Sequence, residues 1–309
     1  DNDRPYLYAG PAKGADVAAW RQAARAELTA AVPGAAYGQV LLDFVKAFER
    51  IPHHLLVVEA IALKYPLWLL RLTLAAYRAA RVIRVDGAIS SLVHAICGIT
   101  AGAGNDTTEM RVMLIRLVDS VVAASYRLKR FIKPSLFVDD LSLELAGTAL
   151  HVIKGLSAAA YATCSLMTTS LLEVSTTKSI CTASTASIGR ALALRLRKWG
   201  IKFKQRVKSL GSALGAGTVR NVTTQRQRLR AFRRRITRFR SLRRAGVDTA
   251  RIARTGGTAA LTYGQATMGV STSTLLLQRR AVAAATAPAS GGGGQSLNMA
   301  LILADASMK

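Results

Sequence analysis

A pair of adjacent acids between two short apolar runs constrains this chain more than any other feature. From Ser135 to Glu144 the sequence reads Ser-Leu-Phe-Val-Asp-Asp-Leu-Ser-Leu-Glu, and Pro134 precedes the first run. Two such runs that meet at polar residues predict a β-hairpin with Asp139 and Asp140 at its tight turn. The two carboxylates repel each other there, so the pair favours a bound cation. Mg²⁺ suits such a place because it binds one or two carboxylates and leaves room for substrate phosphates.

By itself, an Asp-Asp pair also fits an ordinary surface turn. A third acid, Asp43, makes the pair more informative, because it follows a buried-strand pattern that starts at Gly38. After it, Phe44, Phe48 and Ile51 stand three and four residues apart, which is helical spacing. An acid at the end of a strand and two acids at a hairpin turn provide ligands for two-metal phosphoryl transfer. In such sites two ions about 3.5–4 Å apart stabilise the attacking and the leaving oxygen.

Two of these stretches resemble motifs of one known family. Asp43-Phe-Val-Lys-Ala-Phe-Glu-Arg-Ile-Pro-His53 resembles the first palm motif of the reverse transcriptases of non-LTR (LINE-type) retrotransposons. Phe137-Val-Asp-Asp140 is similar to the aromatic-x-Asp-Asp catalytic hairpin of the same family. The motifs stand in the family's order, and the resemblance covers roughly residues 35–215. It implies an RNA-directed DNA polymerase that transfers nucleotides from dNTPs to a primer 3′-hydroxyl.

The resemblance also implies the catalytic residues and the metal ligands. Asp43 and Asp139 would bind two Mg²⁺ ions, with Mn²⁺ as the alternative cation, and Asp140 would support them. The segment around Lys178 resembles the family's next motif, whose lysine stands near the leaving pyrophosphate and could act as a general acid or a charge clamp. In a chain with 43 basic residues, a solvated lysine is an equally good explanation.

Five further residues are expected, on the same resemblance, to contact nucleotide or template: Phe44, Phe48, Gly98, Gly102 and Phe137. Phe48 matches the position of the family's steric gate against a ribose 2′-hydroxyl, although a core phenylalanine explains it equally well. The Gly-rich stretch before a long helix resembles the family's template-contacting loop, and its glycines allow close backbone approach to a phosphate or base. Thr100 and Ala101 replace the usual Pro-Gln of that loop.

The charge of the chain indicates a polyanionic partner. The net charge is +26 and the pI is near 11.1, which favours nucleic acid ahead of an anionic membrane. Thirteen arginines fall between Arg220 and Arg254, interleaved with apolar residues, and predict a basic amphipathic helix. In the resemblance this is the thumb that holds the primer–template duplex, with a small primer-gripping hairpin ahead of it that ends in Leu-Gly211. The arginines expected to contact the nucleic-acid backbone are Arg226, Arg230, Arg233, Arg234, Arg235 and Arg238.

We therefore expect an α+β fold, in which a right-hand polymerase palm with an antiparallel sheet backed by helices precedes a basic, α-helical, thumb-like region. The expected parts are an N-terminal helix that is a remnant of the fingers or palm entry (1–34), the palm (35–218), the thumb-like region (219–287), and a linker with a short C-terminal helix (288–309).

Some patterns are expected to be structural. Residues 155–172 form an uncharged window long enough to span a membrane, but its Ser and Thr content favours a buried helix. The neighbours His53 and His54 would project about 100° apart on a helix, so no metal site is expected there. The cysteines lack metal-ligand spacing and fit buried thiols in a reducing compartment, nucleus or cytoplasm rather than outside the cell. They are Cys97, Cys164 and Cys181.

Three functional interpretations remain open at this stage. The first is the reverse transcriptase domain, with an RNA template, a DNA primer and dNTPs as partners, no membrane, and an open oligomeric state. Few residues precede Asp43, where the family has its fingers, so the chain would be a partial copy. The second is a retroelement relic that binds nucleic acid without copying it. The third is a structural, ribosome-associated basic protein, which would have no use for carboxylates gathered at one point.

Overall fold

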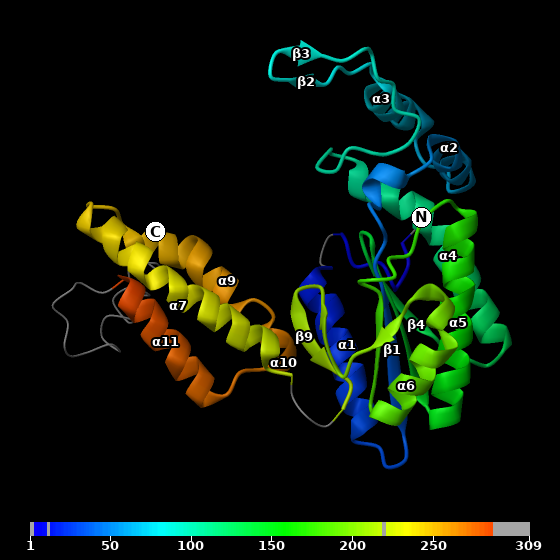
Figure 1. Ribbon diagram of the computed structural model, residues 1–309. Helices are drawn as coiled ribbons and strands as arrows, with labels where there is room; N and C mark the ends of the chain where they lie inside the picture. The colour runs from blue at the N-terminus through cyan, green and yellow to red at the C-terminus, as the bar shows by residue number, and fades with distance from the viewer. Residues whose placement is uncertain (1–2, 11–12, 218–220, 287–309) are drawn as a thin grey trace. The chain divides into compact units, whose positions relative to one another are not determined.

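The computed structural model describes residues 3–10, 13–217 and 221–286 (Figure 1). The chain divides into two compact units, Asp1–Gln205 with Gly215–Thr218, and Arg206–Leu214 with Val219–Lys309. Each unit has its own hydrophobic core. The expected boundary at residue 218 falls close to this division, and the expected N-terminal segment 1–34 belongs to the first unit.

A five-stranded sheet forms the centre of the first unit, in the order β4-β5-β1-β6-β7. Its strands are β1 (Ala36–Leu42), β4 (Lys133–Phe137), β5 (Asp140–Gly147), β6 (Ile180–Ala183) and β7 (Lys202–Phe203). β1 pairs antiparallel with both β5 and β6, but β7 lies parallel to β6. The expectation of an antiparallel sheet is therefore wrong at this edge. The helix α6 (Ala186–Arg195) connects β6 to β7, so that β7 can run in the same direction as β6. One parallel pair among antiparallel pairs makes the sheet mixed.

Helices cover both faces of this sheet (Figure 1). α5 (Ala149–Thr169) and α6 lie on one face, where a Cβ on Gly38 of β1 would meet Val152, Leu156 and Leu192. α4 (Asp106–Arg127) packs beside α5. α1 (Ala15–Ala30) covers the opposite face, as the figure shows. The fold is thus mixed α/β, with a mixed sheet backed by helices.

Alternation along the strands divides apolar from polar side chains. Residues facing α5 are apolar and buried, and they include Val40, Leu42, Leu141, Leu143 and Leu145. The face under α1 carries buried polar groups instead. Arg25 of α1 makes two bonds of 2.8 and 2.7 Å to the carboxylate of Glu144, and the Tyr37 hydroxyl donates a third of 2.7 Å to it. A hydrogen-bonded ion pair therefore fixes α1 on the sheet.

The rest of the first unit surrounds this core. Two helices follow the segment after Asp43, namely α2 (His53–Ala62) and α3 (Leu67–Arg78). A hairpin that turns at Asp86-Gly87 comes next, and its strands β2 (Arg84–Val85) and β3 (Ala88–Ile89) are only two residues long. Beyond them the two arms are joined by hydrogen bonds between Ile83 and Ser90 and by an isolated bridge between Arg81 and Val93.

The second unit joins a small hairpin to the arginine-rich helices. Its elements are β8 (Arg206–Ser209), β9 (Ser212–Gly215), α7 (Thr223–Arg244), α8 (Thr249–Ile252), a π-helical turn (Ala253–Thr258), α9 (Ala259–Thr262), α10 (Gln265–Met268) and α11 (Thr272–Thr286). The hairpin, which was expected with the palm, groups with these helices because the Asn221 amide donates to the carbonyls of Val207 and Leu214. Gly264, at positive φ, separates α9 from α10, and Gly269, also at positive φ, ends α10.

Two smaller expectations can be checked as well. The uncharged window at 155–172 lies mostly in the packed helix α5, and within the described ranges no helix is both long and apolar enough to cross a membrane. Burial raises the pKa of the Cys164 and Cys181 thiols to about 12. Cys97 is exposed, so the expectation of a buried thiol is wrong there. The linker and helix expected in 288–309 lie outside the described residues.

The bond between Arg25 and Glu144 yields the first prediction. Arg25→Met leaves the buried Glu144 carboxylate without its cation, and we expect the free energy of unfolding to fall by about 3 kcal/mol. Urea denaturation followed by circular dichroism measures it. Arg190→Met, at an exposed position of α6, is the matched control and should change the midpoint little. Equal losses in both variants would contradict this role of Arg25.

Candidate catalytic and nucleic-acid-binding site

The pairing of β1 with β5 brings the three acids together where β1 ends and β5 begins, at one end of these inner strands. The last pair of the ladder is Leu42 with Leu141, so the next step places Asp43 opposite Asp140. The main chain of Asp43 is held from the other side. Its N–H donates to the Ser179 hydroxyl at 3.1 Å, and its carbonyl accepts from the N–H of Ser175 at 2.8 Å.

Asp139 sits in a tight and strained turn. Phe137 pairs with Asp140, so only Val138 and Asp139 form the loop of the predicted hairpin. Val138 has φ of 58°, a left-handed conformation that β-branched residues rarely adopt. Strain of this kind persists only where the surrounding structure imposes it, and it gathers at functional sites. The turn therefore holds Asp139 in one place at some energetic cost.

The acids are close enough to affect each other's ionisation. Burial raises the pKa of Asp140 to about 6, with further contributions from the charges of Asp139 and Asp43. Burial also raises the pKa of Asp139, and the charge of Asp43 adds to it. The nearby Lys178 ammonium opposes both shifts. Asp43, Asp139, Asp140 and Lys178 are thus brought together, as the sequence predicts.

Lys178 contacts Asp43 directly. Its Nζ lies 3.3 Å from Asp43 Oδ1, and the lysine side chain is 69% exposed. The N–H of Lys178 donates to the Ser175 hydroxyl, which fixes the turn that carries the lysine. An exposed ion pair of this kind is weak, with a typical contribution of ~0–1 kcal/mol. The lysine can therefore exchange Asp43 for an incoming anion at little cost.

The donor set at this edge consists of carboxylate oxygens, the ligand type that Mg²⁺ prefers. In the part of the chain that the structure describes, no group of three or more His, Cys, Asp or Glu side chains is arranged to hold a metal ion. Mg²⁺ commonly uses only one or two protein carboxylates and takes its other ligands from water and substrate phosphates. The chemistry of the three acids fits such a shared site.

The predicted aromatic contacts differ from one another in exposure. Phe44 is buried at 4% exposure and forms an isolated bridge with Val174, so its side chain belongs to the core rather than to an open binding surface. Phe48, at the start of a short 3-10 helix (Phe48–Arg50), is partly buried against the same core. Phe137 is also partly buried. Of the three, only Phe48 and Phe137 have accessible surface to offer a ligand.

The Gly-rich loop is docked on the segment that follows Asp43. The N–H groups of Gly98 and Ile99 each donate a bond of 2.8 Å, to the carbonyls of Ile51 and Phe48 respectively. Gly98 has φ of 93°, and a Cβ there would lie 2.9 Å from the carbonyl oxygen of Glu49. Only glycine fits this approach. Gly102 also has a positive φ, but its Cβ position is open.

His53 is a residue of this region whose role was not predicted from the sequence. Its buried ring bridges two segments: Nε2 lies 2.7 Å from the carbonyl oxygen of Gly98, and Nδ1 accepts a bond of 3.1 Å from Nε of Arg78. These partners require the tautomer with the proton on Nε2. The sequence carries no local signal for this contact, because the three residues are far apart in the chain.

The helix α7 of the second unit carries the predicted arginines. Leu229, Phe232 and Phe239 are its buried stripe, and the two phenylalanine rings stack with centroids 5.8 Å apart. The six arginines predicted to contact nucleic acid are all exposed: Arg226, Arg230, Arg233, Arg234, Arg235 and Arg238. Among the described residues, no salt bridge neutralises any of them. This face of α7 is available to phosphate groups.

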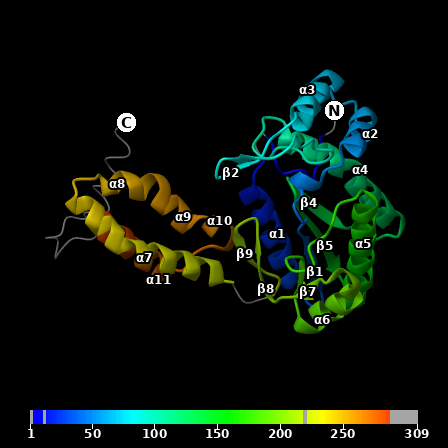
Figure 2. The same cartoon turned by 45° about the horizontal axis from the view of Figure 1, so that its top comes forward.

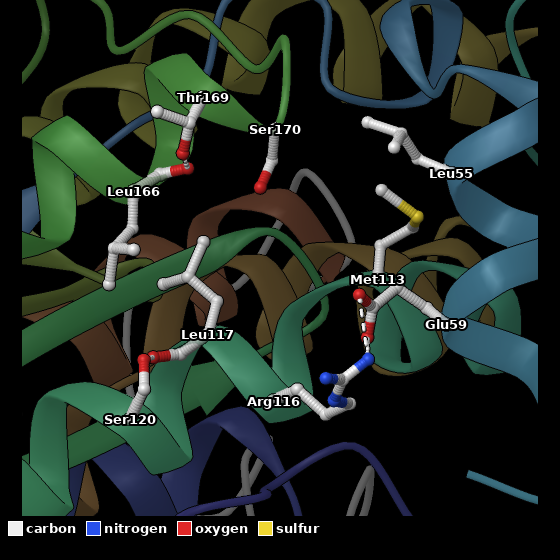
Figure 3. A pocket seen from close by; sticks show the side chains of 9 residues that line it. All are labelled: Leu55, Glu59, Met113, Arg116, Leu117, Ser120, Leu166, Thr169 and Ser170. Atoms are coloured by element: carbon white, nitrogen blue, oxygen red, sulfur yellow. Dashed lines mark hydrogen bonds and ion pairs between the residues drawn. The ribbon is translucent and has the colours of Figure 1, made fainter. Parts of the chain in front are cut away.

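A cavity of about 270 Å³ lies elsewhere in the first unit, between α2, α4 and α5 (Figure 3). It contains none of the acids described above, and an ion pair of 3.2 Å between Glu59 and Arg116 lies at its side. Its lining consists of Leu55, Glu59, Met113, Arg116, Leu117, Ser120, Leu166, Thr169 and Ser170. The cavity is therefore separate from the candidate site.

The raised pKa of Asp140 gives a prediction on stability and pH. The pKa of Asp140 is higher in the folded chain than its ordinary value of 3.8, so the folded chain favours the protonated carboxyl. The contribution of this carboxyl to the free energy of unfolding is therefore fully present below pH 3.8, and it is lost as the pH rises through about 6. Asp140→Asn cannot ionise, so it should stabilise the fold by about 1 kcal/mol near neutral pH. This value is kept small because the residue keeps solvent-exposed surface, although the protein atoms around it desolvate its carboxyl. The gain should shrink below pH 4, as urea denaturation at both pH values can measure.

Carboxyl NMR titration separates the causes of this shift. In the native chain Asp140 should titrate near pH 6, and in Asp139→Asn it should titrate lower, because one neighbouring charge is gone. A native Asp140 that titrates near its ordinary value would contradict the crowded site.

The His53 bridge gives a prediction on the Gly-rich loop. His53→Ala removes the group that holds the Gly98 carbonyl, so the N–H groups of Gly98 and Ile99 should exchange with solvent about tenfold faster or more. Hydrogen exchange followed by NMR measures this. His54→Ala is the matched control, because His54 is the neighbouring histidine and is exposed. This variant should leave both exchange rates unchanged. Equal effects in the two variants would contradict the bridge.

Comparison with known proteins does not assign this chain to a family. No known protein family and no curated protein sequence matches it. The chemistry of the site therefore rests on its own residues: three acids and a lysine at one edge of the sheet, and an arginine-rich helix in the second unit.

Proposed function

We propose that this chain is the reverse transcriptase domain of a retroelement, an RNA-directed DNA polymerase. The single observation that carries the proposal is the convergence of Asp43, Asp139, Asp140 and Lys178 at the β1–β5 edge. The resemblance of the surrounding motifs, and of their order in the chain, to those of the polymerase family supports the same proposal. In this proposal the first unit is the palm and α7 belongs to the thumb.

The acids and the lysine divide the chemistry between them. Asp43 and Asp139 would hold two Mg²⁺ ions, and Asp140 would support them from the neighbouring strand. When bound, Mg²⁺ lowers the pKa of the primer 3′-hydroxyl and neutralises the triphosphate. Lys178 is free to turn from Asp43 to the leaving pyrophosphate, to which its ammonium can donate a proton or a hydrogen bond. His53 would hold in place the Gly98 loop, which the resemblance assigns to template contact.

The partners follow from charge and fold. An RNA/DNA duplex suits the exposed arginines of α7, because a guanidinium binds phosphate with two parallel hydrogen bonds and stays charged. Each phosphate contact steepens the salt dependence of duplex binding by about 0.9 in log–log slope. The dNTP would enter at the acids, and Phe48 and Phe137 are the partly exposed aromatic residues that would contact it.

Primer extension tests this proposal. With poly(rA)/oligo(dT), dTTP and Mg²⁺, the native chain should extend the primer. Asp139→Asn should reduce the rate about a thousandfold, because several kcal/mol of charge stabilisation are lost with a metal ligand. Glu27→Gln, an exposed acid of α1, is the matched control and should extend at the native rate.

A second candidate function is nucleic-acid binding without copying. The exposed arginine face of α7 favours it, since that face needs none of the acids. No extension by the native chain, with tight and salt-sensitive duplex binding, would select this alternative. In that case replacing Arg233, Arg234 and Arg235 by Gln should lower the salt slope of binding by about 2–3. Loss of both extension and duplex binding would contradict both functions.

A further inference from the structure

One arginine of α7 binds main-chain groups of the protein itself. The guanidinium of Arg228 donates from Nη1 to the carbonyl of Tyr263 and from Nη2 to the carbonyl of Gly211, the latter at 2.7 Å. Its Cζ lies 5.1 Å from the centroid of the Tyr263 ring. Arg228 is partly buried, whereas the six arginines predicted to contact nucleic acid are exposed. Arg228 therefore joins α7 to the segment after α9 and to the turn between β8 and β9.

Tyr263 continues this contact at the tip of the hairpin. Its hydroxyl donates to the carbonyl of Leu210 at 3.0 Å. Gly211 has φ of 78°, and a Cβ there would lie 2.7 Å from a ring carbon of Tyr263, so a larger residue would push the ring away. At the base of the hairpin, the Asn221 side chain donates to both strands. The hairpin is thus bound at both ends, and both figures show it next to α10 and the start of α7 (Figures 1 and 2).

The hairpin needs this support and presents a basic face. β8 and β9 form a sheet of only two strands, which is at best marginally stable alone. Along β8, Val207 and Ser209 are buried while Arg206 and Lys208 are exposed. Residues two apart on a strand share one face, so Arg206 and Lys208 point to the same side of the hairpin.

The charge of the second unit is almost entirely positive. Among its described residues Asp248 is the only acid, and its carboxylate caps α8. In the described part of the chain no salt bridge involves Arg206, Lys208 or Arg235. Arg235 stands two helical turns after Arg228, so it lies on the same side of α7, roughly 10 Å along the axis. The arginines of α7 therefore begin close to the hairpin that Arg228 holds.

We propose that Arg228 is a positioning residue of the nucleic-acid-binding surface. It holds the hairpin beside α7, so that Arg206 and Lys208 bind phosphates of the same nucleic acid as the exposed arginines of α7. Arg228 makes no phosphate contact of its own, because its donors are directed at main-chain carbonyls. This role rests on the proposed binding of nucleic acid, with or without copying.

The salt dependence of duplex binding tests this role. Arg228→Lys keeps the charge but loses the planar fork that reaches both carbonyls. Fluorescence anisotropy of a fluorescein-labelled RNA/DNA duplex measures the binding. We expect the log–log salt slope to fall by about 1–2 in this variant, since each phosphate contact accounts for about 0.9. Arg279→Lys, at an exposed position of α11, is the matched control and should keep the native slope.

A mutant cycle separates positioning from direct contact. Arg206→Gln together with Lys208→Gln should lower the slope by about 2. Adding Arg228→Lys to this pair should change the slope little, because the contacts that Arg228 positions are already gone. A further fall in the triple variant would show that Arg228 binds phosphate itself and would overturn the proposal. So would a native slope in Arg228→Lys whose hairpin N–H groups exchange faster, since the arginine would then be structural alone.

A milder variant keeps the test decisive if Arg228→Lys does not fold, which circular dichroism checks. Tyr263→Phe removes only the bond to Leu210, so the N–H groups of β8 and β9 should exchange faster and the salt slope should fall in the same direction. Faster exchange with a native slope would again overturn the role of Arg228. A native chain that does not bind the duplex contradicts nucleic-acid binding itself. Equal slopes in the native chain and in the variant without Arg206 and Lys208 contradict only the part assigned to the hairpin.

Discussion

The pairing register between β1 and β5 is the constraint on which the candidate site depends. It runs from Ala36 opposite Gly147 to Leu42 opposite Leu141, and it carries Asp43 to the level of Asp140. A slip of one residue would turn every side chain to the other face of the sheet. Val40 and Leu143 would then leave the core under α5, so the apolar packing that stabilises the unit also fixes the position of the acids.

The polar face of the same two strands explains how α1 is held. A sheet face with Gln39, Ser142 and Glu144 cannot bind a helix by apolar contact alone. Arg25 and Tyr37 satisfy the Glu144 carboxylate, and Gln22 donates to the Ser142 hydroxyl at 2.9 Å. Since breaking a buried pair leaves an uncompensated charge, this network makes the position of α1 specific. The acids therefore lie at the end of a face that is already ordered.

Local pattern was sufficient to predict several elements but not the contacts between them. The hairpin of Asp139, the strand before Asp43 and the basic helix α7 follow from alternation, turn residues and spacing. The parallel edge strand β7 and the bridge from His53 to Gly98 do not, because they join segments that share no sequence signal. Phe44 shows the same limit, since its place after Asp43 suggested a ligand contact while tertiary packing buries it.

Two local costs coincide at the hairpin turn, and together they bear on the choice between copying and binding alone. Val138 is held at a positive φ, which costs about 1–3 kcal/mol. Asp140 keeps a carboxylate where burial and two neighbouring acids oppose its charge. A protein that only binds nucleic acid gains nothing from either feature, because anionic groups repel phosphate. A site that binds cations between carboxylate and phosphate gains from both, since a strained turn fixes the ligands and a cation relieves their repulsion.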